Sequence, residues 1–139
     1  MKKQTLKFQP KYDFKLLGIV CTCSAIKFAR EIKLISDLEI YLSENHEIYN
    51  EKSPETQQFL LYEALENDEV LSIYILANKS EMGFLIEEHK NIDFFIIIKG
   101  EEKNQLTQQI KKELRNQAEI MAVFDINPEN LNSKQKLLL

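Results

Sequence analysis

The sequence has 139 residues, of which 44% are hydrophobic and 29% are charged, and its formal net charge is −4. This length suits one globular domain with a real core, and the acidic balance disfavours a duplex-binding surface. Since residues 1–8 hold no apolar signal core and no apolar run approaches the ~20 residues of a membrane span, we expect a cytoplasmic protein that binds neither nucleic acid nor membrane.

The first predicted elements are a buried strand and an amphipathic helix, preceded by an N-terminal arm over residues 1–12. Residues 16–23 form a short apolar run typical of a buried strand. Ser24 is suited to cap a helix, and apolar side chains then follow at helical spacing: Phe28, Ile32 and Ile35. Residues 37–43 alternate between apolar and polar side chains, which predicts a half-buried strand.

The middle of the chain is predicted to be a loop followed by a hairpin. Residues 44–56 are polar and contain Pro54, which indicates a loop. Two apolar runs, residues 59–66 and 70–77, flank Asn67 and its acidic neighbours. Because Asn and Asp tolerate the backbone of tight turns, these runs predict a β-hairpin.

A second strand–helix–strand pattern follows a turn and a short extended piece over residues 80–88. Residues 92–98 are apolar on both faces, which predicts a strand at the centre of a sheet. A helical stripe comes next, formed by Leu106, Ile110 and Leu114. Residues 120–126 alternate as a final strand, and residues 128–139 form a C-terminal tail with one helical turn, whose leucines cover the core or meet a partner subunit.

The element order is β-α-β, a hairpin, and β-α-β again, within a single α+β domain over residues 1–139. Each β-α-β unit implies a parallel strand pair with a right-handed crossover. Both helices then lie on one face of a mixed sheet, which gives a two-layer sandwich. The predicted fold is therefore ferredoxin-like, with an inserted hairpin.

Residues 84–94 read Phe-Leu-Ile-Glu-Glu-His-Lys-Asn-Ile-Asp-Phe, and residues 78–81 before them read Asn-Lys-Ser-Glu. With residues 12–14, Gly18, Cys21 and residues 123–128, this block resembles the IPExxxVDY family of small bacterial proteins, mostly from Bacteroidetes. That family has no established activity, so the resemblance implies neither a substrate nor a cofactor.

The chain departs from the named motif at three positions. Glu87 stands in place of the motif's Pro, which removes a rigid φ constraint. Phe94 stands in place of its Tyr, which removes a hydroxyl, and Ile92 in place of its Val. Phe94 therefore cannot fill a role that needs the hydroxyl.

The candidate binding residues are polar side chains in and around this block: Asn78, Lys79, Glu81, Glu88 and Asp93. Asp93 opens an apolar strand, so it is either a carboxylate at a pocket rim, paired with Lys79 or Lys90, or a charge that blocks pairing at the strand end. A hydrolase or transferase would use Asp93, Glu88 and His89. Because neighbours in an extended chain point to opposite faces, we expect these three side chains not to converge and the protein not to be an enzyme.

Cys21 and Cys23 are two residues apart on a predicted strand, so their side chains share a face. This spacing is not that of a redox or zinc motif, and burial in the core is the expected role, with a redox or ligand role as the alternative. Neither a set of convergent metal ligands nor a glycine-rich phosphate loop is visible in the sequence. We therefore expect no metal and no cofactor.

Charge is unevenly spread: residues 1–36 carry eight basic and two acidic side chains, whereas residues 37–102 carry four basic and sixteen acidic. Such polarity favours self-association or a charged partner, unless folding interleaves the segments and cancels the field. The leading hypothesis is a non-enzymatic protein-binding or adaptor module that acts as a homodimer or binds an unidentified protein. The alternative is a small-molecule-binding regulatory domain, by analogy with other two-layer sheets.

Overall fold

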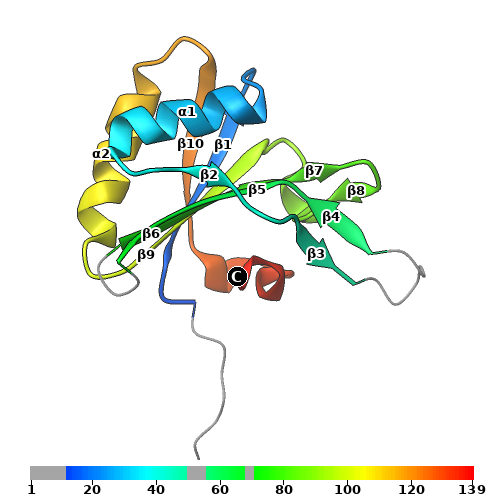
Figure 1. Cartoon of the computed structure of the whole chain (residues 1–139). Helices are drawn as coiled ribbons and strands as arrows, with labels where there is room; N and C mark the ends of the chain where they lie inside the picture. The colour runs from blue at the N-terminus through cyan, green and yellow to red at the C-terminus, as the bar shows by residue number, and fades with distance from the viewer. Residues whose placement is uncertain (1–11, 50–55, 68–70) are drawn as a thin grey trace, which may run out of the picture.

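A computed structural model describes residues 12–49, 56–67 and 71–139 of the chain. Its centre is a six-stranded sheet in the order β10-β1-β9-β6-β5-β2. The strands are β1 (Lys15–Cys21), β2 (Tyr41–Leu42), β5 (Leu61–Asn67), β6 (Leu71–Ala77), β9 (Phe94–Lys99) and β10 (Ile120–Ile126). Two helices, α1 (Ala25–Ser36) and α2 (Lys103–Arg115), pack on one face of this sheet (Figure 1). The fold class is therefore α+β.

The predicted mixed sheet is wrong for the described strands, because every neighbouring pair in the six-stranded sheet is antiparallel. The two strands joined by α2, β9 and β10, lie on either side of β1 rather than side by side. Three strands separate β1 from β2, the strand that follows α1. The sheet has six strands, and their full order is not ferredoxin-like, so the ferredoxin-like prediction is not confirmed.

The predicted hairpin is confirmed as an antiparallel pair, with β5 and β6 in register from Leu61 opposite Leu76 to Asn67 opposite Leu71. Its predicted turn residues, 68–70, lie outside the described residues. The first apolar run is interrupted at Leu60, because Gln57–Phe59 forms the separate strand β4. This strand pairs with β3 (His46–Ile48), which lies inside the predicted loop.

Helix α1 begins where the sequence predicts, since the Ser24 side chain accepts a hydrogen bond from the Lys27 backbone N–H at 3.3 Å. It ends at Asp37, whose φ of 59° is left-handed and whose N–H donates to the Lys33 carbonyl at 2.9 Å. The predicted strand over residues 37–43 is therefore mostly wrong: its first residue caps the helix, and only Tyr41–Leu42 pairs in the sheet.

The helix-covered face has a regular apolar core. Phe28 of α1 is fully buried and stacks on Phe94 of β9 with ring centroids 4.9 Å apart. The predicted stripe of α2 is buried against the same face: Leu106, Ile110 and Leu114. Strand β9 lies between β1 and β6 and is buried on both faces, which confirms the prediction of a central strand.

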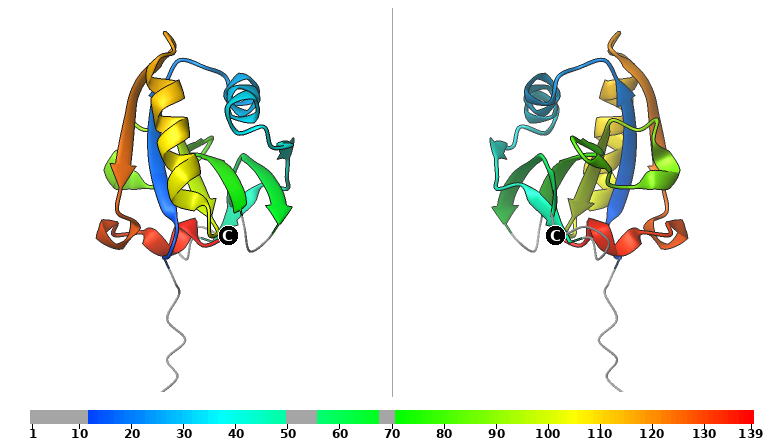
Figure 2. Two further views of the ribbon diagram at one scale, coloured as in Figure 1. Left: turned by 90° about the vertical axis from the view of Figure 1, so that its left-hand side faces the viewer. Right: turned by 90° about the vertical axis from the view of Figure 1, so that its right-hand side faces the viewer.

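The opposite face of the sheet is also covered, so the two-layer prediction is incomplete. Its cover includes the short 3₁₀ helices η1 (Glu87–His89), η2 (Pro128–Asn130) and η3 (Lys134–Leu137), and a second apolar core there contains Leu85, Ile86, Leu131 and Leu137. The short strands β7 (Lys79–Ser80) and β8 (Gly83–Phe84) precede η1 as a separate antiparallel pair. Figure 2 shows the C-terminal segment, in red, across one end of the sheet. Leu137 is fully buried in this second core, so part of the tail covers the core, as one of the two predicted alternatives states.

Strand β10 is an outer edge of the sheet. Ile19 of β1 accepts a hydrogen bond from the Asp93 N–H at 2.8 Å, on the β9 side of β1. Because bonded pairs alternate in an antiparallel ladder, Val123, which lies opposite Ile19, turns its own N–H and C=O toward the free edge. The Arg115 guanidinium donates to that carbonyl oxygen at 3.2 Å, so a charged side chain covers the middle of the edge.

Candidate functional site

Asn78 connects the end of β6 to the chain that follows it. Its side chain is fully buried, and Nδ2 donates to the carbonyl oxygens of His89 at 2.8 Å and Ile92 at 2.9 Å. Its Oδ1 accepts from the Ile86 N–H at 2.8 Å. Both donor hydrogens of the amide and its oxygen are therefore used within the protein. Asn78, predicted as a binding residue, is placed to hold the backbone and not to meet a ligand.

Asp93 bridges two elements at the start of β9. One carboxylate oxygen accepts from the Cys21 N–H at 3.0 Å, and the other lies 3.1 Å from Lys79 Nζ. Of the two partners that the sequence suggests for Asp93, Lys79 and Lys90, the structure shows the ion pair with Lys79. The other, Lys90, instead places its ammonium 5.8 Å from the centre of the Phe84 ring. Asp93 ties β9 to the irregular end of β1.

Glu88 and Glu81 lie apart from this pair. Glu88 Oε2 accepts from the Asn132 N–H at 2.9 Å, which fixes the segment between η2 and η3. Glu81 is exposed in the turn between β7 and β8. Of the five predicted binding residues, the structure brings together Asn78, Lys79 and Asp93, while Glu88 and Glu81 stand separately.

The three side chains suggested for catalysis are also engaged in different places. Glu88 holds Asn132, Asp93 holds Cys21, and His89 lines a cavity. Among the residues that the structure describes, no hydrogen bond joins any two of Glu88, His89 and Asp93. The structure therefore does not bring these three side chains together in one hydrogen-bonded group.

A cavity of about 440 Å³ lies between residues 89–92 and residues 124–131. Its floor is apolar: Ile92 and Leu131 are 1% and 5% exposed, and Ile126 is partly buried beside them. Phe124 stands at the rim and is 44% exposed. The polar lining consists of His89, Asn91, Asp125, Asn127 and Asn130. This combination of apolar floor and few polar groups is typical of a small-molecule site.

The residues of the 78–93 block position one wall of this cavity. Asn78 holds the carbonyls of His89 and Ile92, and Glu88 holds the segment that follows Leu131. Gly18 makes room for the floor, because a Cβ there would lie 2.5 Å from Ile92 Cδ1 and 2.7 Å from Ile126 Cδ1. The block therefore acts through backbone placement, and it contributes His89, Asn91 and Ile92 to the lining.

Sequence reasoning missed this cavity because its two walls, residues 89–92 and 124–131, are far apart in the sequence. From the sequence, His89 suggests only a metal ligand or a catalytic base, Asn127 marks the end of the final strand, and Asn130 falls in the C-terminal tail. Their only local signal is that two amides follow the end of an apolar strand. Nothing in that spacing links them to His89.

A wider hollow of about 840 Å³ lies beside β3 and β5, lined mostly by polar residues 43–47 together with Tyr74 and Leu139. His46 Nε2 lies 2.7 Å from the Lys136 carbonyl oxygen at this side, so the hollow is bounded by the anchored tail. It is larger than the cavity at His89 but more open. We therefore take the smaller, more enclosed cavity as the candidate site.

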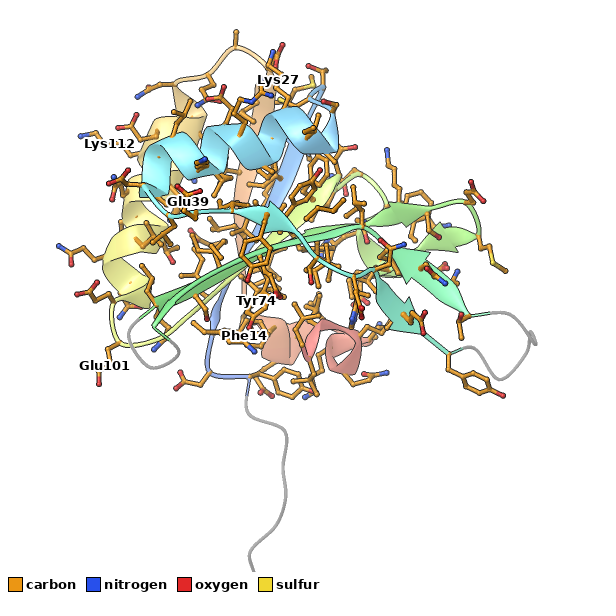
Figure 3. All side chains as sticks on the ribbon, in the orientation of Figure 1. Phe14, Lys27, Glu39, Tyr74, Glu101 and Lys112 are labelled. Atoms are coloured by element: carbon orange, nitrogen blue, oxygen red, sulfur yellow. The ribbon has the colours of Figure 1, made fainter. Side chains whose placement is uncertain are left out.

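A separate polar cluster surrounds Cys23 near the start of α1, where Lys27 is labelled in Figure 3. Cys23 Sγ donates to one oxygen of Glu119 at 3.1 Å, and Lys27 Nζ lies 2.7 Å from the other. Burial, followed by the Glu119 carboxylate, raises the pKa of Cys23 to about 12. The hydrogen bonds from Lys27 and then Cys23 lower the pKa of Glu119. The thiol therefore stays protonated at neutral pH and is a weak nucleophile.

One lysine lies against aromatic rings on the second face. Lys99 Nζ is 5.9 Å from the ring centre of Phe14 and 5.2 Å from that of Tyr74, both labelled in Figure 3. Burial lowers the pKa of Lys99. These contacts place the ammonium within the packing at the end of β9, away from the residues that line the cavity.

No family model and no curated protein matches this sequence. Within the described ranges, no group of three or more His, Cys, Asp or Glu side chains could hold a metal ion. None of the helices in those ranges is long and apolar enough to cross a membrane. The chemistry of the site therefore rests on its own geometry.

Proposed function

We propose that this protein is a non-enzymatic module that binds a small molecule in the cavity between residues 89–92 and 124–131. The observation that carries the proposal is a cavity of about 440 Å³ with a buried apolar floor. Binding pockets for small ligands commonly measure about 300–1,000 Å³ and combine such a floor with a few orienting polar groups.

Uncommitted polar side chains support this function. The His89 ring and the amides of Asn91 and Asn130 line the cavity. In the part of the chain that the structure describes, these three side chains donate and accept no hydrogen bond. A ligand could therefore bond to them without breaking contacts that hold the fold. This property distinguishes them from Asn78, whose amide is fully used.

A thermal-shift screen of small metabolites tests the proposal. A ligand at 100 times its dissociation constant stabilises the folded state by about 2.7 kcal/mol. We expect a hit to stabilise the wild type and the variant Asn104→Ala, which changes an exposed Asn on α2 away from the cavity. The shift should be lost in Asn130→Ala. Equal shifts in all three proteins, or no shift with any compound, would contradict the proposal.

Self-association or binding of another protein is the second candidate function. Met121 and Phe124 on the outer strand β10 are large apolar side chains that are 70% and 44% exposed. The Arg115 guanidinium already donates a hydrogen bond to the Val123 carbonyl oxygen. A partner would therefore contact these apolar side chains and would not add a strand to the edge of the sheet. Sedimentation velocity should give a dimer for the wild type and a monomer for Met121→Lys. A wild type that stays monomeric at all concentrations removes the homodimer.

Two further proposals concern origin and fold. The proposed kinship with the IPExxxVDY family rests on the sequence alone, chiefly on residues 78–81 and 84–94. A ferredoxin-like core with added strands is supported by α2, which joins β9 to β10 across β1. In that proposal β5 and β2 are the additions. A location in the cytoplasm remains a prediction.

A further inference from the structure

The charges around the cavity disfavour an anionic ligand. Of the described residues, those that line the cavity include neither Lys nor Arg. The one Asp or Glu among the lining residues is Asp125, and its carboxylate is already paired with Lys111 of α2. Sites for phosphate or carboxylate groups normally supply a cationic side chain or several aligned backbone N–H groups. The part of a ligand that enters this cavity should therefore be uncharged.

The polar lining is dominated by carboxamides. Asn91, Asn127 and Asn130 each place an amide at the cavity. The Asn127 oxygen accepts from the Glu129 N–H at 3.1 Å, which leaves its NH₂ group to donate, whereas the other two amides keep both functions. A carboxamide presents a donor and an acceptor side by side, so it pairs best with a ligand edge that does the same. A purely apolar ligand would leave these amides without partners and without water.

The remaining surface suits a flat ring. Phe124 at the rim exposes 44% of its surface, and the aliphatic floor is formed by Ile92, Ile126 and Leu131. A planar heterocycle can lie on such side chains and direct its polar edge at the amides. Stacking of a base on an aromatic side chain adds to affinity whichever base is bound, because every base has a π-face.

We propose that the cavity takes an uncharged planar nitrogen heterocycle of the nucleobase or nucleoside class, with its ring against Phe124 and its hydrogen-bonding edge at Asn91, Asn127 and Asn130. This inference rests on the proposed small-molecule function and gives the class of its ligand.

Isothermal titration calorimetry with the full chain tests the class. The probes are the common purine and pyrimidine nucleosides, with indole as a planar ring that lacks an adjacent donor and acceptor. We expect at least one nucleoside to bind more tightly than indole. Its affinity should fall at least tenfold in Asn130→Ala and in Phe124→Leu, which keeps an apolar side chain but removes the aromatic face. Asn104→Ala should bind like the wild type.

The outcomes separate the ligand class from the function. Indole binding as tightly as every nucleoside, with the same loss in Phe124→Leu, would overturn the heterocycle while leaving a small-molecule cavity. The same holds if nucleosides fail and a metabolite of another class, or a short peptide, gives a shift that Asn130→Ala abolishes. If neither the nucleosides nor any compound of the thermal-shift screen binds, both proposals fail together. Nucleoside binding that is equal in all variants would place the ligand elsewhere and overturn the inference.

Discussion

The two faces of the sheet are covered in different ways. On one face, α1 and α2 bury regular apolar stripes, and the stacked pair Phe28 and Phe94 lies at the centre of their packing. On the other, short segments are held by side chains bonded to backbone, above all Asn78 and Glu88. Regular packing fills space completely, whereas irregular chain fixed by polar bonds can leave a shaped cavity. The difference explains why the candidate site lies on the irregular face.

The largest effect should come from the helix face. Phe28→Ala removes a fully buried ring, so the free energy of unfolding should fall by about 3–5 kcal/mol. Chemical denaturation measures this loss, and the protein that remains folded should keep its cavity. Ile26→Ala on the same helix is the control, because Ile26 is 62% exposed and should change stability by no more than about 0.5 kcal/mol. Similar losses for both variants would mean that this face is not the packed one.

A loss of about 3 kcal/mol is expected for Asn78→Ala, because each unmade buried hydrogen bond costs about 1–3 kcal/mol. The carbonyls of His89 and Ile92 and the N–H of Ile86 would lose their partner. Hydrogen exchange should quicken over residues 85–92 while α1 and α2 stay protected. If Asn78→Ala were as stable as Asn104→Ala, polar bonds would not be what holds the irregular face.

A smaller loss, about 1–3 kcal/mol, is expected for Gly18→Ala, because a Cβ there forces the methyl ends of Ile92 and Ile126 to move. Both side chains form the cavity floor, so ligand affinity should change along with stability in denaturation and titration experiments. The double variant Gly18→Ala, Ile92→Val removes one of the two clashing methyls and should recover part of the stability. Full tolerance of Gly18→Ala would show that the floor is loosely packed.

The smallest effect on stability is expected for Glu119→Gln, because the Glu119 side chain is 44% exposed and its ion pair with Lys27 is solvated. Its clearest consequence concerns Cys23, whose pKa of about 12 should fall once the carboxylate is gone, although burial keeps it above the ordinary value. Iodoacetamide should therefore modify Cys23 faster at pH 8.5 in the variant than in the wild type, with Cys21→Ser used in both backgrounds. An unchanged rate would mean that Glu119 does not control the thiol.

The same cluster gives a pH dependence with a defined sign. Because the folded state raises the pKa of Cys23, it holds that proton more tightly than the unfolded chain does. The resulting stability is present at neutral pH and is lost as the pH rises toward 12. Glu119 behaves in the opposite sense, since its pKa is lowered and its contribution is lost as the pH falls into the acid range. Denaturation curves across pH should show both losses of stability in the wild type, and both should be smaller in Glu119→Gln.

Local patterns were enough to predict much of the helix face. The apolar spacing of α1 and α2, the Ser24 cap and the buried run of β9 depend on neighbours within one or two turns. The strand order was not predictable in this way, because it depends on contacts such as those of β1 with both β9 and β10. Asp37 shows the limit of local patterns. The alternation of residues 37–43 predicts a strand, but Asp37 adopts a left-handed backbone conformation and ends helix α1 there.

The irregular face was predicted least. The pairing of Asp93 with Lys79 could be anticipated, because both residues belong to one short block. The bonds of Asn78 to three backbone groups have no periodic signature, and neither does the meeting of His89 with Asn127 and Asn130. Which backbone groups a polar side chain can bond to depends on the three-dimensional path of the chain. That path is fixed only once the strands have paired, so the sequence alone does not show it.

The guanidinium on the Val123 carbonyl also limits how far the sheet can extend. A strand from another molecule that approached β10 would first have to displace the Arg115 side chain. Only then could its backbone form a hydrogen bond with the Val123 carbonyl in the middle of β10. Loss of this side chain would leave the outward carbonyl of Val123 open to a strand from another molecule. Arg115 thus protects the middle of the outer edge of the sheet.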